Sequence, residues 1–426
     1  MKASKLKAKL ADGSLDDALI RLYGDAALEK QKNRYAAAID SFTGLFGDDR
    51  CLVLFSVPGR SEISGNHTDH NRGRVLAAAV DLDIIAVAAK RDDAAVTVKS
   101  EGFEPDTVTL GCEPDPAQFF TSSALIAGVA DGLVKRGFKA GGFDAYTTSA
   151  VLKGSGLSSS AAFEVMIGTI QNHLYNDAVV TLPVIAEIAQ YAENVYFGKP
   201  CGLMDQTACA VGGFIEIDFE NPKAANIQKL PFDLTAAGYS LCITDTGGNH
   251  ADLNEDYASV PAEMKKVAAC FGRDALRGLT EQDIIDRMAS LRETCGDRAV
   301  LRALHFIREN DRVLTQGEAL KNGDLDGFLA GVLASGRSSF MWLQNCFTVK
   351  NIKEQGVTLA LLMSEMLLSG QKAAWRVHGG GFAGTVQAFV PHAYVETYRA
   401  GMEAVFGKGS CTPLTIRQQG ATLVIG

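Results

Sequence analysis

The pattern of apolar and polar positions divides the chain near residue 50. Before that point, Ala18, Leu19, Leu22 and Tyr23 recur at helical spacing, and we expect residues 1–48 to form a helical extension. After it, short apolar or alternating runs are separated by charged residues and glycine-containing turns, which predicts strands of one sheet. These runs are CLVLFSV (51–57), VLAAAV (75–80), DIIAVAA (83–89) and AVTVKS (95–100).

Helices and strands are mixed along the rest of the chain. We expect helices over 122–137, from about Ser158, over 183–197 and between 259 and 370, and strands over 144–152, 214–219, 239–245 and 386–390. Because the two types do not strictly alternate, the order favours an α+β fold over a doubly wound parallel sheet. We expect the helical extension (1–48) to be followed by an N-terminal domain (49–225) and a C-terminal domain (226–426).

Composition and charge mainly exclude classes of protein. The chain has 426 residues and a formal net charge of −9, which argues against the basic surface that nucleic acids and anionic membranes attract. The sequence contains no apolar stretch long enough to span a bilayer and no secretory signal. Nine cysteines are scattered without a C-x-x-C pair, as in reduced cytoplasmic proteins. We therefore expect a cytoplasmic protein without nucleic-acid or membrane partners.

The first candidate for chemistry is the loop KGSGLSSSAA (153–162), between a predicted strand and a predicted helix. Glycines let the backbone approach a ligand, and the unpaired N–H groups at a helix start bind phosphate. Serine hydroxyls add donors, and one of them can ligate magnesium. The loop matches neither a Walker A loop nor a Rossmann fingerprint. A serine-capped turn without a ligand is the alternative, and the strand–loop–helix setting favours nucleotide phosphate binding.

Two further segments combine glycines with polar residues. HGGGFAG (378–384) leads into the strand at 386–390, and a flexible turn is its simplest interpretation. PGRSEISGNHTDHNRG (58–73) follows an apolar strand and concentrates side chains that can hydrogen-bond the hydroxyls of a sugar. The alternative for this segment is a solvated loop. Two glycine loops that are far apart in sequence, each beside a strand, suggest the walls of one cleft.

Together these segments resemble the galactokinases, members of the GHMP small-molecule kinase superfamily. The galactokinase signature G-R-x-N-x-I-G-E-H-T-D-Y-N-x-G is matched at Gly59, Arg60, Gly65, His67, Thr68, Asp69, Asn71 and Gly73. The phosphate loop G-x-G-L-S-S-S-A is matched at 154–161, P-C-G-I-M-D-Q at 200–206, and G-G-G-F-G-G at 379–384, with Ala383 in place of one glycine. The matches follow the family's order.

The resemblance implies a two-domain kinase with its active site between the domains. It would transfer the γ-phosphoryl group of ATP, with Mg²⁺, to the anomeric hydroxyl of galactose. By resemblance, the catalytic residues are Asp205 and Arg60, and Asp205 either accepts a proton or orients the acceptor. The implied sugar-binding residues are Asn66, His67, Asp69, Gly202 and Tyr257. The implied ATP-binding residues are Gly154, Ser155, Gly156, Leu157, Ser158, Ser159 and Ser160, and the implied magnesium ligands are Ser160 and Glu193.

The chain departs from the signature at the position that would name the sugar. Asn66 stands where the family has a glutamate, and His70 stands where it has a tyrosine; Ser61 and Glu62 replace part of the R-x-N stretch. By resemblance, that glutamate contacts the C6 hydroxyl, whereas an asparagine is neutral and offers a donor and an acceptor. Galacturonate, arabinose or another C6-altered galactose therefore stays open as the substrate.

Other classes of function are also open. Some galactokinase-like proteins bind ATP and sugar as sensors without turnover, but the intact Ser158–Ala162 loop, Arg60 and Asp205 favour an active enzyme. A GHMP kinase for a non-sugar alcohol, such as mevalonate or homoserine, is disfavoured by the G-x-H-T-D and P-C-G-x-M-D-Q matches. We expect a small-molecule sugar substrate and a monomer or weak homo-oligomer.

Overall fold

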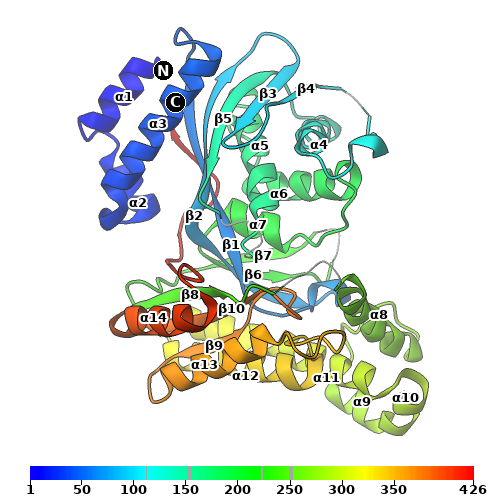
Figure 1. Cartoon of the computed structure of the whole chain (residues 1–426). Helices are drawn as coiled ribbons and strands as arrows, with labels where there is room; N and C mark the ends of the chain where they lie inside the picture. Colours follow the sequence, from blue (N-terminus) through cyan, green and yellow to red (C-terminus); the bar gives the residue numbers. More distant parts are fainter. Residues whose placement is uncertain (112, 152–155, 222–223, 249–252) are drawn as a thin grey trace.

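The chain folds into two lobes, each built on its own β-sheet (Figure 1). The computed structural model describes residues 1–111, 113–151, 156–221, 224–248 and 253–426. An eight-stranded sheet forms the first lobe and a four-stranded sheet forms the second. Within the described residues, all paired strands are antiparallel except one pair in the first sheet. The predicted α+β fold is confirmed.

The first sheet is extended at one end by a pair of strands from the middle of the chain. Its strands are β1 (Val53–Ser64), β2 (Arg74–Lys90), β3 (Ala95–Ser100), β4 (Asp106–Thr109), β5 (Phe143–Ser149), β6 (Phe214–Asp218), β7 (Asn226–Leu230) and β12 (Thr422–Ile425). Their order is β12-β1-β2-β5-β3-β4, and β6 pairs with β2 on one side and with β7 on the other. The parallel pair is β3 with β5.

β2 is longer than the sequence predicts. The apolar runs at 75–80 and 83–89 were expected to be two strands, because Asp81 lies between them and Asp83 begins the second, but they join into one. The chain stays extended because both aspartates are satisfied: the Asp81 carboxylate accepts a hydrogen bond from the backbone N–H of Thr415 at 3.1 Å, and Asp83 lies in a polar cluster. One end of β2 therefore pairs with β6 and the other with β5.

Helices cover both faces of the first sheet, which is why its strands are apolar on both sides. Ala86 and Ala88 face the core beneath α4 (Ser122–Lys135), α5 (Ser159–Tyr175), α6 (Leu182–Tyr191) and α7 (Met204–Val211). Ile85 and Val87 belong to a second core on the opposite face. Neighbouring residues of one strand thus alternate between two hydrophobic cores.

The helical extension covers that second face. It contains α1 (Ala3–Ala11), α2 (Asp16–Tyr23) and α3 (Leu28–Phe46), at the upper left of Figure 1. Leu6, Leu19, Ile39 and Phe42 are completely buried in the core that these helices share with the sheet. Residues 1–48 are therefore an integral layer of the first lobe.

A buried carboxylate, Asp83, fastens this layer to the sheet. Arg34 of α3 donates to Asp83 at 2.6 Å, Tyr23 of α2 donates its hydroxyl to Asp83 at 2.6 Å, and Arg417 lies 3.3 Å from it. Burial raises the pKa of Asp83, but the two arginines lower it more, so the net pKa lies below the usual value. Asp83 is therefore a carboxylate at neutral pH.

The second lobe packs helices around a smaller sheet. Its strands are β8 (Tyr239–Asp245), β9 (Ala374–Val377), β10 (Thr385–Pro391) and β11 (Cys411–Leu414), in the order β11-β8-β10-β9. Its helices are α8 (Asn254–Cys270), α9 (Glu281–Asp286), α10 (Met288–Cys295), α11 (Asp297–Lys321), α12 (Leu325–Ser338), α13 (Gly356–Leu368) and α14 (Val395–Phe406). α13 and α14 share a core with β10, and α8–α11 share another, to the right in Figure 1.

The two lobes share strands across the predicted domain boundary. β7 extends the first sheet through β6, and β12 pairs with β1, although both belong to residues 226–426. The local apolar pattern of a strand does not encode its partner, so the sequence could not assign these strands. The division at 225/226 stays a prediction. Separately, none of the described helices has the length and apolar character needed to cross a bilayer.

We predict that Asp83→Asn destabilises the protein by about 3 kcal/mol in urea unfolding at pH 7, because it leaves the buried Arg417 and the partly buried Arg34 without a counter-charge. The pKa of Asp83 is lowered in the folded state, so its stabilisation is fully present above the unfolded pKa of about 3.9 and is lost as pH falls through the folded pKa. The difference between wild type and variant should therefore shrink in acid.

Asp40→Asn is the matched control. Asp40 pairs with Lys7 at 2.7 Å, but both side chains are exposed, so we expect a loss below about 1 kcal/mol. Equal effects of the two substitutions would contradict the anchoring role of Asp83.

Candidate active site

The serine-rich loop turns sharply into helix α5. Gly154 and Ser155, two of the predicted ATP-binding residues, lie outside the described residues. Gly156 has a φ of +74° and Ser158 a φ of 57°, both in the left-handed region. A non-glycine residue in this region is uncommon and marks a locally constrained turn. Ser158 is the N-cap residue of α5, yet its side chain does not cap the helix.

The end of the loop is fixed to β1, and the helix start is left accessible. The backbone N–H of Arg60 donates to the carbonyl of Leu157 at 3.1 Å, and the Leu157 side chain is buried. Ser159 and Ser160 form the first turn of α5 and are only partly buried. A helix start of this kind presents N–H groups and a partial positive charge to an anion.

Arg60 and Asp205 form a two-point ion pair beside this loop. Arg60 Nε donates to Asp205 Oδ1 at 2.7 Å, and Arg60 Nη2 donates to Asp205 Oδ2 at 2.8 Å. Arg60 Nη1 also donates to the carbonyl of Gly156, and the Ser158 hydroxyl donates to Asp205 Oδ2. The structure therefore brings together the two predicted catalytic residues and the phosphate loop.

The surroundings keep Asp205 ionised. Burial raises its pKa, but the charge and hydrogen bonds of Arg60 and the hydrogen bond of Ser158 lower it more, so the net pKa is below the usual value. The Arg60 side chain is 9% exposed and that of Asp205 is 33% exposed, so the carboxylate can reach a ligand. A carboxylate with a lowered pKa is a weak proton acceptor, which favours an orienting role over that of a strong base.

Glu193, a predicted magnesium ligand, lies in a cluster of carboxylates. It belongs to a π-helical turn (η4, Ala192–Tyr196) after α6 and is almost fully buried. Gln206 donates to Glu193 at 2.7 Å and to Glu164 at 3.2 Å, and Lys199 pairs with Glu193 at 3.0 Å. One oxygen of Glu164 is buried without a hydrogen-bond partner among the described residues. Burial and the charge of Glu193 raise the pKa of Glu164.

Asp69 and Gly202, two predicted sugar-binding residues, adjoin each other. A cavity of about 250 Å³ is lined by both, together with Cys201 and Leu203. A Cβ atom on Gly202 would lie 2.7 Å from an oxygen of Asp69, so a larger residue at this position would displace the Asp69 carboxylate. The turn that carries Gly202 is fixed from α6, because Gln190 donates to the carbonyl of Cys201 at 3.1 Å.

His67 and Tyr257 both contact the second glycine run. His67 Nε2 lies 2.9 Å from the carbonyl oxygen of Gly380, and the Tyr257 hydroxyl donates to the carbonyl of Gly381 at 2.9 Å. A Cβ atom on Gly380 would lie 2.7 Å from the Tyr257 ring. Burial lowers the pKa of His67 to about 4, so its imidazole is neutral at pH 7. The two glycine loops and the signature segment therefore meet, as the sequence suggested.

Helix α11 of the second lobe holds the signature segment in place. The Glu309 carboxylate accepts hydrogen bonds from the Ser64 hydroxyl and the Gly65 N–H, both at 3.0 Å. His305 Nε2 lies 3.0 Å from the carbonyl oxygen of Asn66. Glu309 is completely buried, and opposing positive charges hold its pKa at about 2. The loop is thus positioned by charged and polar groups from the other lobe.

Asn66, a predicted sugar-binding residue, is enclosed by protein groups. It is completely buried. Its amide nitrogen donates to Glu62 at 2.8 Å and to the carbonyl of Gly379 at 2.7 Å, and its amide oxygen accepts from Asn345 at 2.7 Å. The amide is therefore saturated by the protein, because Glu62 stands four residues earlier. Where the family signature has Asn then Glu, this chain has Glu62 then Asn66, and the carboxylate–amide pair is kept in reverse order.

Comparisons with known proteins agree with this arrangement. Residues 40–90 match the galactokinase galactose-binding signature, and residues 124–213 match the GHMP kinase N-terminal domain. A galactokinase of Streptomyces coelicolor is 32% identical over 83% of this chain and 88% of its own length. One of Actinobacillus pleuropneumoniae is 34% identical over 85% of this chain and 91% of its own length. The chain belongs to the galactokinase family.

The fold comparison extends this result. The crystal structure of Lactococcus lactis galactokinase complexed with galactose has a TM-score of 0.76, covers 92% of this chain and 99% of its own, and is 22% identical. A mevalonate kinase structure matches with a TM-score of 0.59. The predicted two-domain GHMP kinase fold and the predicted enzyme class, a sugar kinase that uses ATP, are confirmed. The roles of individual residues stay predictions.

Sequence reasoning missed several residues of this galactokinase-family site. Glu62 was treated only as a departure from the signature, and Glu164 was not singled out, although it lies one helical turn after Ser160. His378 was noted only as the start of a glycine run. Its Nδ1 lies 2.8 Å from the Thr385 hydroxyl, its ring packs against Gly156, and burial lowers its pKa to about 3. The feature of the sequence that could have identified His378 is its position between a strand and three glycines.

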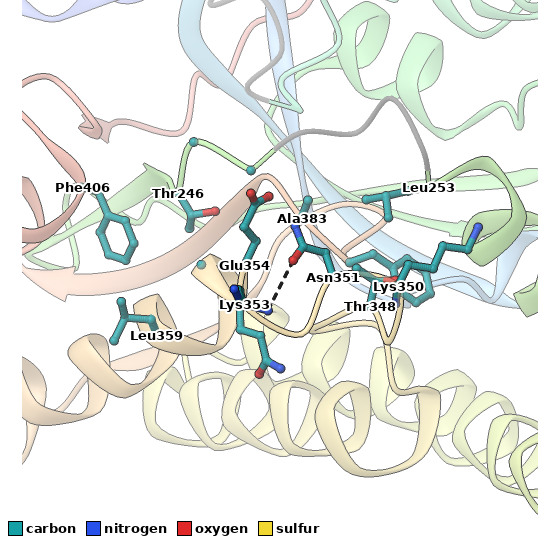
Figure 2. A pocket seen from close by; sticks show the side chains of 15 residues that line it. Thr246, Leu253, Thr348, Lys350, Asn351, Lys353, Glu354, Leu359, Ala383 and Phe406 are labelled. Atoms are coloured by element: carbon teal, nitrogen blue, oxygen red, sulfur yellow. Dashed lines mark hydrogen bonds between the residues drawn. The ribbon is translucent and has the colours of Figure 1, made fainter.

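A larger cavity lies apart from these residues. It has a volume of about 730 Å³ and is lined by Thr246, Thr348, Lys353, Leu359 and Phe406, among others. Figure 2 shows these side chains around the segment that precedes α13. Phe382 and Ala383 of the second glycine run also line it, but none of the predicted site residues does. This cavity is therefore distinct from the smaller one that Asp69 and Gly202 line.

We predict that Arg60→Lys lowers kcat on the order of 100-fold, because a lysine cannot hold both oxygens of Asp205 and the carbonyl of Gly156 together. The Michaelis constant for ATP should change much less. Initial rates in a coupled ADP-release assay measure both constants.

Arg50→Lys is the control, because Arg50 also bonds a carboxylate (Asp144, 2.9 Å) and a carbonyl (Lys90, 2.7 Å) but lies outside the site. Arg50→Lys should leave kcat unchanged. A kcat for Arg60→Lys equal to that of the control would show that the two-point ion pair is dispensable.

Proposed function

We propose that this protein is a galactokinase that transfers the γ-phosphoryl group of MgATP to the anomeric hydroxyl of galactose, giving galactose 1-phosphate and ADP. The observation that carries the proposal is the two-point pairing of Arg60 with Asp205, with Ser158 on the same carboxylate. In this proposal the ion pair holds the Asp205 carboxylate, which would bind the acceptor hydroxyl, next to the loop that would bind the donor phosphates. The relatives named galactokinase and the galactose complex of the Lactococcus lactis enzyme support the choice of sugar.

In this proposal the loop and helix α5 hold the nucleotide. The N–H groups of the first turn and the hydroxyls of Ser159 and Ser160 would bind phosphate oxygens. Phosphoryl transfer depends mainly on in-line positioning and on stabilisation of negative charge. Arg60 supplies a fixed positive charge at this place, and its burial strengthens that charge's effect.

On the sugar side, Asp205 would accept the hydrogen bond of the anomeric hydroxyl. As the bond between the γ-phosphorus and ADP breaks and the bond to the sugar oxygen forms, the hydroxyl proton becomes acidic. Because the pKa of Asp205 is lowered, the carboxylate orients the hydroxyl early and can accept its proton only late in the reaction. Asp69, His67, Gly202 and Tyr257 would surround the rest of the ring.

The carboxylate cluster fits a magnesium ion. Glu164 and Glu193 bring two carboxyl groups together, and burial and the negative charge of Glu193 raise the pKa of Glu164, one oxygen of which is buried without a hydrogen-bond partner among the described residues. A hard divalent cation prefers such oxygen ligands and would offset this charge. We propose that Glu193 and the Ser160 hydroxyl hold Mg²⁺, which would neutralise charge on the ATP phosphates. Glu164 would then support Glu193.

The alternatives raised by the sequence lose their basis in this geometry. The C6-altered substrates were suggested by Asn66, whose amide is saturated by the protein. The sensor was disfavoured by an intact catalytic set, and Arg60 and Ser158 both hydrogen-bond the carboxylate of Asp205. We also propose a cytoplasmic location, because the described cysteines are all free thiols.

The substrate assignment is tested with purified protein, labelled ATP and a panel of galactose, galacturonate and arabinose. We predict that kcat/KM for galactose exceeds that for the other two sugars by about 100-fold or more, since the site would hold the complete hexose by hydrogen bonds. Binding of ATP and sugar by calorimetry without phosphate transfer would instead identify a sensor.

The variant Asp205→Asn separates chemistry from binding in the same assay. It should lower kcat by about 10²- to 10⁴-fold and leave the calorimetric affinity for galactose within about tenfold. Preference for galacturonate or arabinose in the wild-type protein would overturn the galactose assignment.

The reversed Glu62–Asn66 pair is tested by a double-mutant cycle of Glu62→Asn, Asn66→Glu and the combined exchange. Asn66→Glu alone places two carboxylates together in a buried site, so it should be the most destabilising; the combined exchange restores one carboxylate and one amide. We predict a coupling free energy of about 1–3 kcal/mol in urea unfolding, together with recovery of the galactose KM in the double variant. Additive effects would show that the two residues act independently.

A further inference from the structure

The outer face of helix α13 is apolar, although nothing in the described chain covers it. Leu359, Leu362 and Met366 recur at i, i+3 and i+7 and are 44%, 51% and 66% exposed. The opposite face of the helix is already used, because Val357, Ala360 and Leu368 are buried. A helix that is apolar on both faces normally has a partner on each.

This face continues into a groove between α12 and α13, which we call the α12–α13 groove. It has a volume of about 360 Å³ and is lined by Leu333, Phe340, Met341, Leu361, Leu362 and Trp375. Phe340 and Met341 belong to a π-helical turn (η5, Ser339–Leu343) and are 41% and 58% exposed. Figure 1 shows α12 and α13 at the lower margin of the second lobe, away from the first lobe.

Two opposite charges border the α12–α13 groove. Arg337 of α12 and Glu365 of α13 both line it and both are exposed. Among the described residues, neither has an ion pair or a hydrogen-bonded partner for its side chain. One face of the molecule thus carries an apolar centre with one unpaired positive and one unpaired negative group.

We propose that the α12–α13 groove is the interface of a homodimer with two-fold symmetry. In such an interface the same patch meets itself, so each contact between two different positions occurs twice. Arg337 of each chain would meet Glu365 of the other, and both charges would be paired by one symmetry operation. A different protein would need a matching pair of charges of its own, whereas a second copy supplies them automatically.

The size of the patch agrees with this occupant. Phe340, Met341, Leu359, Leu362 and Met366 are each at least 41% exposed, and together they expose roughly 500 Å² of apolar surface. A standard interface buries about 800 Å² per partner, of which somewhat more than half is apolar. None of the predicted active-site residues lines the groove, so dimer formation leaves the site of each chain open.

The test uses the full-length protein in analytical ultracentrifugation across a concentration series. We expect the wild type to form a species of twice 45.3 kDa, with a dissociation constant in the micromolar range of about 1–10 μM. R337E places acidic groups opposite each other and E365R places basic groups opposite each other. Each single variant should therefore weaken the dimer by about tenfold or more.

The decisive sample is an equimolar mixture of the R337E and E365R proteins. One chain then has two acidic groups at the groove and the other has two basic groups, so a heterodimer with both pairs restored should form preferentially. K30E is the matched control: Lys30 lies in α3 of the first lobe, and its substitution should leave the dimer unchanged. Circular dichroism and kinase rates verify that every variant is folded.

Three outcomes would overturn the proposal. A wild type that stays monomeric up to about 100 μM would show that the face is not an interface between copies. A dimer that tolerates both R337E and E365R would place the interface on another surface. Weakening by both variants without recovery in the mixture would exclude the reciprocal Arg337–Glu365 contact.

Discussion

The ion pair between Arg60 and Asp205 fixes the relative positions of three segments that are distant in sequence. Arg60 projects from β1, Asp205 begins α7, and the carbonyl of Gly156 and the hydroxyl of Ser158 bring in the phosphate loop. A buried guanidinium needs both of its acceptors, the Asp205 carboxylate and the Gly156 carbonyl, because each lost partner leaves part of its charge unsolvated. One side chain therefore holds α7 and the phosphate loop together. The Ser158 hydroxyl donates to the Asp205 carboxylate and therefore does not cap helix α5.

Residues of the second lobe mainly form hydrogen bonds that hold the signature segment of the first lobe in position. Glu309 binds the backbone at Gly65, and Asn345 and the carbonyl of Gly379 saturate Asn66. Glu309, Asn345 and Asn66 are completely buried, so their hydrogen bonds are strong and poorly replaceable. The signature segment (58–73) is therefore held in place by residues of both lobes. Its geometry depends on the packing of α11 and of the second glycine run as much as on its own sequence.

The sequence predicted those parts of the fold that depend on local pattern. The helices of residues 1–48 and the strands β1, β3, β5 and β6 follow from apolar spacing, since a face that is buried must be apolar. The full length of β2 was not predicted, because Asp81 and Asp83 indicate a break between two strands when only the local sequence is considered. Thr415 and Arg34, which are distant in sequence, supply their hydrogen-bond partners. The hydrogen bonds of Asn66 could not be predicted from the local sequence for a related reason. Its chemistry is decided by Glu62, Asn345 and Gly379, and only the first of these is close in sequence. Motif matches identified Arg60, Asp205 and Asp69 as candidate site residues. The periodicity of apolar positions could not identify them, because it carries no information about contacts between segments distant in sequence.

The return of β12 to the edge of β1 has a consequence for the order in which the protein folds. The first sheet receives its last strand from residues 422–425, and Arg417 reaches the Asp83 cluster beneath α2 and α3. The whole second lobe is therefore inserted between the first and last strands of one sheet. A folding chain can build most of the first lobe early, but the edge of β1 stays uncovered until residues 422–425 return to it. Until then β1 presents unpaired backbone groups, so completion of the first lobe depends on the return of β12 past the whole second lobe.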